Sequence, residues 1–270
     1  MNNNPLITFS TTPDGEWSYR ITPEGNRSHL LQFLVRSCPE QLPPARQLLS
    51  KLCAIGYLLK PEKDSDFSPA VVGVSPNPEA GQSLFGDIIA ALLPTARFSG
   101  EETRNIHLPS AWIRISDNSR VVFLDRLPRD FYFDCLFSYI TGVWSFEIPR
   151  DARLVMPDFE LPLNHLSGAH IEAFDFKRGP KIYIAASAPI IGVSPSFEDR
   201  QWTLPFPDSA PSVPHGHPLP GFAPGQEALT SALVRQCGEL YRLFGYVPVP
   251  PHPRTHDIRI CLREQKGGRP

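Results

Sequence analysis

The segment 68–93 changes from a strand-like to a helical pattern within a few residues, which restricts the folds open to the chain. Its first part, SPAVVGV, is a short β-branched run that predicts a strand. A turn-rich loop with Pro76 and Gly81 follows, and the apolar residues after it recur on one helical face. These residues are Leu84, Phe85, Ile88, Ile89, Leu92 and Leu93. Parallel sheets are built from strands that lead through a loop into a helix, so the segment predicts an α/β fold.

Later apolar runs extend this prediction to a buried sheet. RVVFLD at 120–125 and PKIYIAAS at 180–187 are almost unbroken apolar runs, as expected of strands covered on both faces. AWIRI at 111–115 predicts a further strand. We therefore expect a three-layer α/β sandwich. Its parallel, neighbouring strands are expected at 71–74, 121–124 and 182–185.

Helical spacing and proline signals divide the chain into three parts. Residues 1–65 are predicted to be a lead-in of strand and helices, 66–207 the α/β core, and 208–270 a proline-rich extension with a linker, a helix and a loose tail. The segment 205–225 holds too many prolines for a helix or a ladder. Helices are expected at 28–38, 44–59, 131–141 and 226–244, a hairpin-like excursion at 143–158, and a short strand at 257–262.

Composition narrows the class of protein. With 270 residues, 41% hydrophobic and 20% charged, the chain has an ordinary globular composition apart from its 31 prolines. The formal net charge of -2 gives no overall basic field that would attract nucleic acid. Five scattered cysteines without metal-ligand spacing predict reduced thiols in a cytoplasmic protein. The N-terminus has no signal-peptide pattern and no apolar run reaches about 18 residues, so no membrane partner is expected.

The loop at 76–83 partly matches a phosphate-binding loop of the form G-x-x-x-x-G-K-[ST]. In such a loop the backbone N–H groups and the helix N-terminus hold the phosphates of ATP, the lysine neutralises them, and the hydroxyl binds Mg²⁺. Gly81, Gln82 and Ser83 occupy the last three positions, while Pro76 stands where the first glycine belongs. These three residues are the candidate nucleotide-binding set, and the lysine is missing from it.

Residues at the ends of later strands fit the rest of such a site. Asp125 follows a buried strand, where an acid would hold Mg²⁺ together with Ser83. Ser187 ends the next central strand, where a polar group would position the attacking water. Arg200 follows that strand and could serve the γ-phosphate of a neighbouring subunit. Asp125, Ser187 and Arg200 are therefore the candidate catalytic residues.

From about residue 28 to 206 the chain resembles the superfamily 3 helicase-like ATPase domain of primase-helicase proteins from phages and bacterial mobile elements. The stretches that carry the resemblance are NPEAGQSLFGDII, VVFLDRLPRDFYFDCLFSYITG, PKIYIAASAPIIG and SFEDRQWTLPF. The second is the most specific, because its phenylalanine-rich helix followed by I-T-G is no general part of a phosphate-loop protein. The resemblance implies a P-loop NTPase-like sandwich that hydrolyses ATP with Mg²⁺, assembles as a hexamer and translocates DNA during replication.

The chain departs from this family at four positions that matter for catalysis. The loop lysine corresponds to Gln82, the second acid to Arg126, the sensor asparagine to Ser187, and one of two adjacent arginines to Asp199. Gln82 supplies no counter-charge, and Arg126 is expected to compete with Mg²⁺ for Asp125. Loss of one preorganised catalytic group typically costs ~3 kcal/mol of transition-state stabilisation. Four such losses can abolish turnover, although their effects do not add.

Three interpretations follow. The chain is an active helicase-like ATPase in which Arg126 or another cation replaces the lysine, a pseudo-ATPase that serves as a binding or scaffold subunit, or an α/β interaction domain without a nucleotide site. Four ordered matches favour common descent, and four departures favour lost hydrolysis, so we expect the pseudo-ATPase. Its binding of ATP and Mg²⁺ is expected to be weak or absent, and its partners to be DNA or replication proteins in a homo-oligomer or hetero-oligomer.

Other polar residues give weaker signals. The histidine pairs in PHGHP and PHPRTH lie in proline-rich coil without cysteine partners, so solvated histidines are a better interpretation than a metal site. Acids outnumber bases in the segment 149–179, which does not favour a DNA contact there. The tryptophans at 112, 144 and 202 accompany strand-like patterns and are interpreted as core residues.

Overall fold

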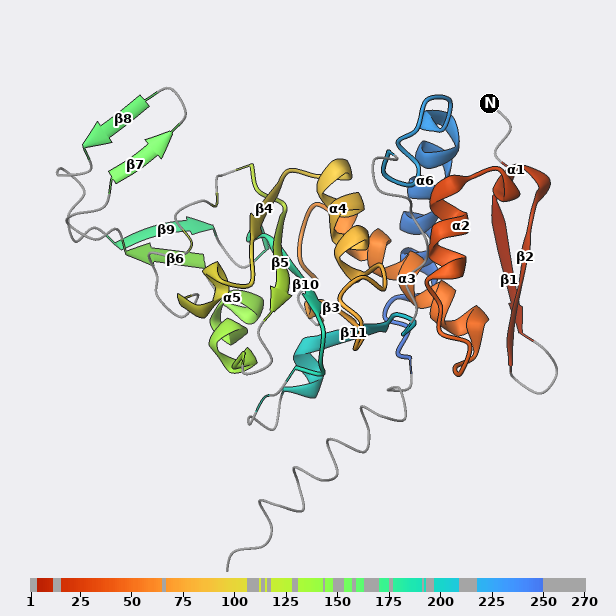
Figure 1. Ribbon diagram of the computed structural model, residues 1–270, viewed down its shortest axis with the longest axis horizontal. Coiled ribbons are helices and arrows are strands. Elements are labelled where there is room, and N and C mark those ends of the chain that lie inside the picture. Colours follow the sequence, from red (N-terminus) through yellow and green to blue (C-terminus); the bar gives the residue numbers. More distant parts are fainter. Residues whose placement is uncertain are drawn as a thin grey trace, which may run out of the picture.

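The computed structural model describes residues 4–11, 16–64, 67–105, 112, 115, 118–127, 131–142, 144–147, 153–156, 159–162, 170–174, 177–190, 192, 197–208 and 218–249. At its centre lies a five-stranded sheet in the order β11-β3-β10-β5-β4, in which every neighbouring pair is parallel (Figure 1). The strands are β3 Ala70–Val74, β4 Thr95–Phe98, β5 Val121–Leu127, β10 Lys181–Ala186 and β11 Gln201–Pro205. Since β10 pairs with both β3 and β5, the three strands predicted to be parallel neighbours are confirmed.

Helices cover one face of the sheet. Helix α4 (Gln82–Leu92) packs on β3, β10 and β5, and α3 (Pro44–Leu59) packs on β11. A buried cluster joins Phe85 and Ile88 of α4 to Phe123 and Tyr183 of the sheet. Helix α4 lies so close to the sheet that a Cβ at Gly86 would run into the Phe123 ring. The hydrophobic side of α4 therefore fixes the loop that precedes it against the carboxyl ends of the strands.

A second layer covers the opposite face. It contains the 3₁₀ turn η3 (Phe133–Leu136), the short helix α5 (Phe137–Thr141) and the fully buried Trp112 and Trp144. Alternate strand residues such as Val72, Val122 and Ile184 point into this cluster. Both faces of the parallel sheet are thus buried, which confirms the α/β sandwich.

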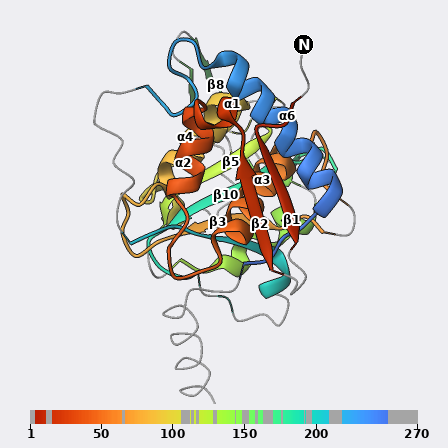
Figure 2. The same ribbon diagram turned by 90° about the vertical axis from the view of Figure 1, so that its right-hand side faces the viewer.

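The N-terminal hairpin and the late helix α6 lie together beside α3. The hairpin β1 (Ile7–Thr11) and β2 (Trp17–Ile21) is followed by α1 (Pro23–Asn26) and α2 (His29–Arg36). The long helix α6 (Glu227–Phe244) packs along α3, and Figure 2 shows α6 and the hairpin together on this side. Gln236 of α6 accepts hydrogen bonds from the backbone N–H groups of Leu6 at 2.9 Å and Ile7 at 3.4 Å.

The expected N-terminal helices have clear local causes. Pro44 occupies the first turn of α3, where its missing N–H removes no helical bond. The Ser28 side chain accepts from the N–H of Leu31 and caps α2. In the part of the chain that the structure describes, no helix combines the length and apolar character needed to cross a membrane.

Several predicted elements differ from the structure. At 111–115 no strand forms at Trp112 or Ile115, and the other three residues lie outside the described part. Trp112 instead lies in a 3₁₀ turn, where it is buried edge-on against Trp144. The strand at the edge of the sheet next to β5 is β4. The predicted helix at 131–141 begins at Phe133 as a 3₁₀ turn.

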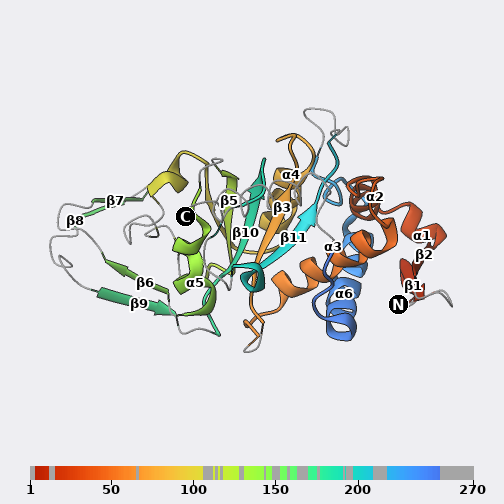
Figure 3. The ribbon, with the colours of Figure 1, turned by 90° about the horizontal axis from the view of Figure 1, so that it is seen from below.

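The excursion after α5 is also more complex than a single hairpin. Strand β6 (Trp144–Glu147) pairs with the distant β9 (His170–Phe174), and only β7 (Arg153–Met156) and β8 (Phe159–Pro162) form a local hairpin (Figure 3). The predicted strand at 257–262 and the four histidines at 215, 217, 252 and 256 lie outside the described residues.

Candidate functional site

The site begins at the loop between β3 and α4. Gly81 has a left-handed φ of 101°, which glycine adopts without a Cβ clash, and it turns the chain directly into α4. No side chain caps the first N–H groups of this helix. The positive end of the α4 dipole therefore faces the carboxyl end of the sheet, where an anion could approach it.

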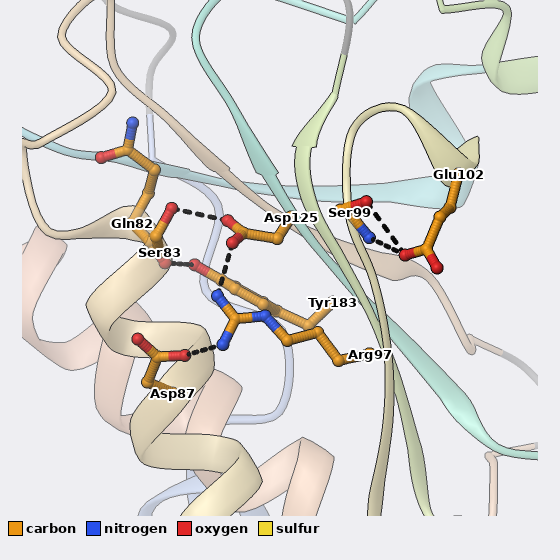
Figure 4. Close-up of polar contacts among 8 residues, drawn as sticks. All are labelled: Gln82, Ser83, Asp87, Arg97, Ser99, Glu102, Asp125 and Tyr183. Carbon is orange, nitrogen blue, oxygen red and sulfur yellow. Dashed lines mark hydrogen bonds and ion pairs between the residues drawn. The ribbon is translucent and has the colours of Figure 1, made fainter. Parts of the chain in front are cut away.

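Gln82, which stands in place of the lysine, is turned into its own loop. Its side chain donates from Nε2 to the carbonyl oxygen of Asn77 at 2.9 Å, and only 2% of the residue is exposed. Its Oε1 is buried and has no hydrogen-bond partner. The backbone oxygen of Gln82 accepts from the hydroxyl of Tyr183 at 2.7 Å, which anchors the first turn of α4 to the sheet. Figure 4 shows the Gln82 amide pointing away from Asp125.

Ser83 and Asp125 come together as the sequence predicts. Asp125 lies near the end of β5 and is 6% exposed. The Ser83 hydroxyl donates to its Oδ1 at 2.6 Å across the gap between α4 and the sheet. A hydroxyl and a carboxylate that are 42 positions apart in sequence thus form one polar pair at the carboxyl end of the sheet.

Arg97 completes this cluster, and the sequence did not point to it. It lies on β4, which is the edge strand next to β5. Its Nη2 donates to Oδ2 of Asp125 at 2.5 Å, and its Nη1 donates to Oδ1 of Asp87 at 2.7 Å (Figure 4). Burial disfavours the charge of Arg97, but the hydrogen bonds and charges of the two carboxylates outweigh this effect and raise its pKa. Burial raises the pKa of Asp87, and the positive charge of Arg97 opposes that rise.

Arg126 does not take the place expected of it. The prediction that Arg126 competes for Asp125 is wrong in its choice of residue, because the guanidinium bonded to Asp125 belongs to Arg97. Arg126 is exposed and has a positive φ of 55°, at a bulge where β5 carries one more residue than β10. Such strained backbone is costly for a non-glycine residue and concentrates at functional sites. A Cβ at Gly100 would run into the Arg126 carbonyl oxygen, so close packing supports the bulge.

Ser187 and Arg200 lie at opposite ends of the parallel strands. Ser187 is half-buried and directly follows β10. It therefore lies at the carboxyl ends of the strands, as do the loop and Asp125. Arg200 directly precedes β11, which places it at the amino edge, and its guanidinium lies 4.2 Å from the centre of the Phe137 ring. Arg200 is therefore not part of the Ser83–Asp125 cluster of its own chain. Its action on a neighbouring subunit stays a prediction.

The donor set does not fit a resident Mg²⁺ bound by Ser83 and Asp125. Both oxygens of Asp125 already accept hydrogen bonds, one from Ser83 and one from Arg97. The guanidinium also places a positive charge where the metal would bind. Within the described ranges, no group of three or more histidine, cysteine, aspartate or glutamate residues could hold a metal ion.

Comparison with protein-family models finds no match, and comparison with curated proteins finds none.

Proposed function

We propose that this chain is a degenerate, helicase-like pseudo-ATPase related to replication proteins of mobile elements. It acts as a binding or scaffold subunit with little or no ATP hydrolysis, and its partners are DNA or replication proteins in the cytoplasm. The sandwich in this proposal is of the P-loop NTPase type.

One observation carries the proposal. The Gly81 turn, the uncapped start of α4 and Asp125 meet at the carboxyl edge of the sheet, with Ser83 bonded to Asp125 at 2.6 Å. In open α/β sheets this edge is where ligands bind. The hydrogen bond between Ser83 and Asp125 joins the two groups that the proposed site pairs at this position.

The same geometry argues against efficient hydrolysis. Gln82 carries no charge, and its amide is engaged by the loop through Asn77. The carboxylate of Asp125 is neutralised by Arg97 rather than left open for a metal. Phosphoryl transfer depends almost entirely on positioning and on such charges, so these losses remove most of the catalytic effect.

A nucleotide titration by calorimetry tests the proposal on the wild-type chain and on Gln82→Lys. The variant restores the loop cation, so we expect it to bind ATP about 5- to 150-fold more tightly, as for a charge-assisted hydrogen bond worth ~1 to 3 kcal/mol. Gln41→Lys is the matched control, because it adds the same charge at an exposed position between α2 and α3. Tighter binding by Gln82→Lys alone supports the proposal.

An interaction domain without a nucleotide site is the second candidate. It is favoured by the bond from Gln82 to Asn77, which closes the loop upon itself. If wild type, Gln82→Lys and Gln41→Lys all fail to bind ATP, the segment from Gly81 to Ser83 is only a turn, and this second candidate replaces the first.

A further inference from the structure

Arg97 is held between two carboxylates that come from different elements. Asp125 lies on β5 and Asp87 on α4, and each accepts one hydrogen bond from the same guanidinium. Ser83 and Asp87 are four residues apart, so both face Arg97 and Asp125 from one side of α4. The guanidinium thus joins the helix to the neighbouring strands (Figure 4).

Without Arg97, this corner would hold two carboxylates and a hydroxyl with no guanidinium bridging the acids, although the positive charge of Arg126 still acts on Asp87. The charge of Asp125 already raises the pKa of Asp87, so the two acids are close enough to repel each other. Carboxylate and hydroxyl oxygens are the ligands that Mg²⁺ and Mn²⁺ prefer. The Arg97 and Asp87 side chains are 49% and 30% exposed, so an ion from solvent can reach the corner.

We propose that Arg97 is a built-in substitute for a divalent cation at this corner. The side chain supplies the positive charge that holds Asp87 and Asp125 together, and wild type therefore needs no metal there. The inference rests on the proposed function in one respect, namely that the corner belongs to a nucleotide-binding site of a kind that uses a metal ion. It adds a residue, Arg97, and a second acid, Asp87, that this site type does not require.

The inference predicts that removing the guanidinium creates a metal site. Arg97→Gln keeps a polar side chain that is shorter and uncharged, and it leaves both carboxylates without the guanidinium that bridges them. We expect its melting temperature to fall and to recover at millimolar Mg²⁺ or Mn²⁺, measured against NaCl of equal ionic strength. Wild type is expected to show no such rise. Binding of Mn²⁺ itself, followed by electron paramagnetic resonance, should be at least tenfold tighter in Arg97→Gln than in wild type.

Three further variants separate a metal site from general charge effects. Arg20→Gln removes an exposed arginine from another strand, β2, and should show no divalent effect. Arg97→Gln combined with Asp125→Asn should lose both the recovery and the Mn²⁺ binding. Arg97→Lys keeps a cation and should stay insensitive to metal, which also covers the case in which Arg97→Gln folds too poorly to measure.

The experiment contains no nucleotide, so its result is independent of whether the chain binds ATP. Recovery of Arg97→Gln by divalent ions, lost on changing Asp125, supports the inference. Wild type that binds Mn²⁺ as tightly as Arg97→Gln overturns it, and so does an Arg97→Gln variant that folds without binding Mn²⁺. An Arg97→Lys variant that requires divalent ions for stability would also contradict it.

Discussion

Gln82 and Arg97 show what single residues do and do not reveal in this sequence. Gln82 stands at a recognisable motif position, so the loss of the lysine charge could be predicted from the sequence alone. Arg97 lies in no motif, and its role depends on β4 being placed beside β5, which brings it to Asp125. The sequence therefore predicted Ser83 and Asp125 as partners but named Arg126, the nearer arginine in sequence, as the competing cation. A strained bulge turns that residue to the surface.

Buried lysines give the chain a pH dependence that can be measured. Burial lowers the pKa of the fully buried Lys51, and Lys63 and Lys181 are buried as well. Lys63 donates to the backbone oxygen of Tyr139, and Lys181 donates to that of Lys60. Burial lowers the pKa of Lys63 and of Lys181 to about 7. Nearby positive charges lower these pKa values further: that of Lys181 acts on Lys63, and that of Arg120 acts on Lys181. In an unfolded chain both lysines keep their ordinary pKa near 10.4. Between these values the unfolded state binds more protons, so stability rises with pH.

We therefore expect the free energy of unfolding to rise between pH 7 and 8, with Lys63 and Lys181 each contributing about 1 kcal/mol per pH unit. Chemical denaturation at a series of pH values measures this slope. Lys181→Met should lower the slope by the contribution of one lysine, whereas Lys177→Met, at an exposed position nearby, should leave it intact. A stability that is flat or falls over this range would show that the two amines are not held in the neutral form. Burial raises the pKa values of four cysteines, and these oppose the rise increasingly as the pH approaches their ordinary value of about 8.5. They are Cys38, Cys53, Cys135 and Cys237.

At the scale of elements, pattern and structure agree where burial is continuous. The three central strands are mostly apolar because both faces of the sheet are covered, and α3 and α6 follow helical spacing. Strand β4 was not predicted, since it has only four residues with alternating burial and directly follows Pro94. AWIRI has a strand-like pattern, yet Trp112 is buried against other aromatic rings, which local periodicity does not encode.

The packing of α4 on the sheet gives a direct test of this arrangement. In Gly86→Ala the new methyl group meets the Phe123 ring, and overpacking of this kind costs about 1 to 3 kcal/mol. Gly238→Ala on α6 is the matched control, because nothing lies within 4 Å of the added Cβ. That change should stabilise the protein by up to about 1 kcal/mol through helix propensity. Urea denaturation of the two variants distinguishes them, and equal effects would mean that α4 is not seated on the sheet as described.

At the scale of the whole molecule, the sheet places the candidate residues in two groups. Because the strands are parallel, the loop, Asp125 and Ser187 lie at their carboxyl ends, and Arg200 lies at their amino ends. A site that used all of them would need a second copy of the chain to supply its arginine. Segments at both ends of the chain complete the helical side, where α6 packs on α3 and holds β1 through Gln236. The prediction of three successive parts, divided at 65 and 207, could not show the contact between α6 and α3, because that contact depends on tertiary packing.

ATP hydrolysis by the purified chain is the most direct test of the proposal that a nucleotide-type site has lost its chemistry. Phosphate release should be measured with Mg²⁺ for the wild type and for Asp125→Ala. We expect background rates for both, because Gln82 supplies no cation and Arg97 occupies the carboxylate of Asp125. A wild-type turnover on the order of 1 s⁻¹, within the range of working enzymes, that Asp125→Ala abolishes would contradict it.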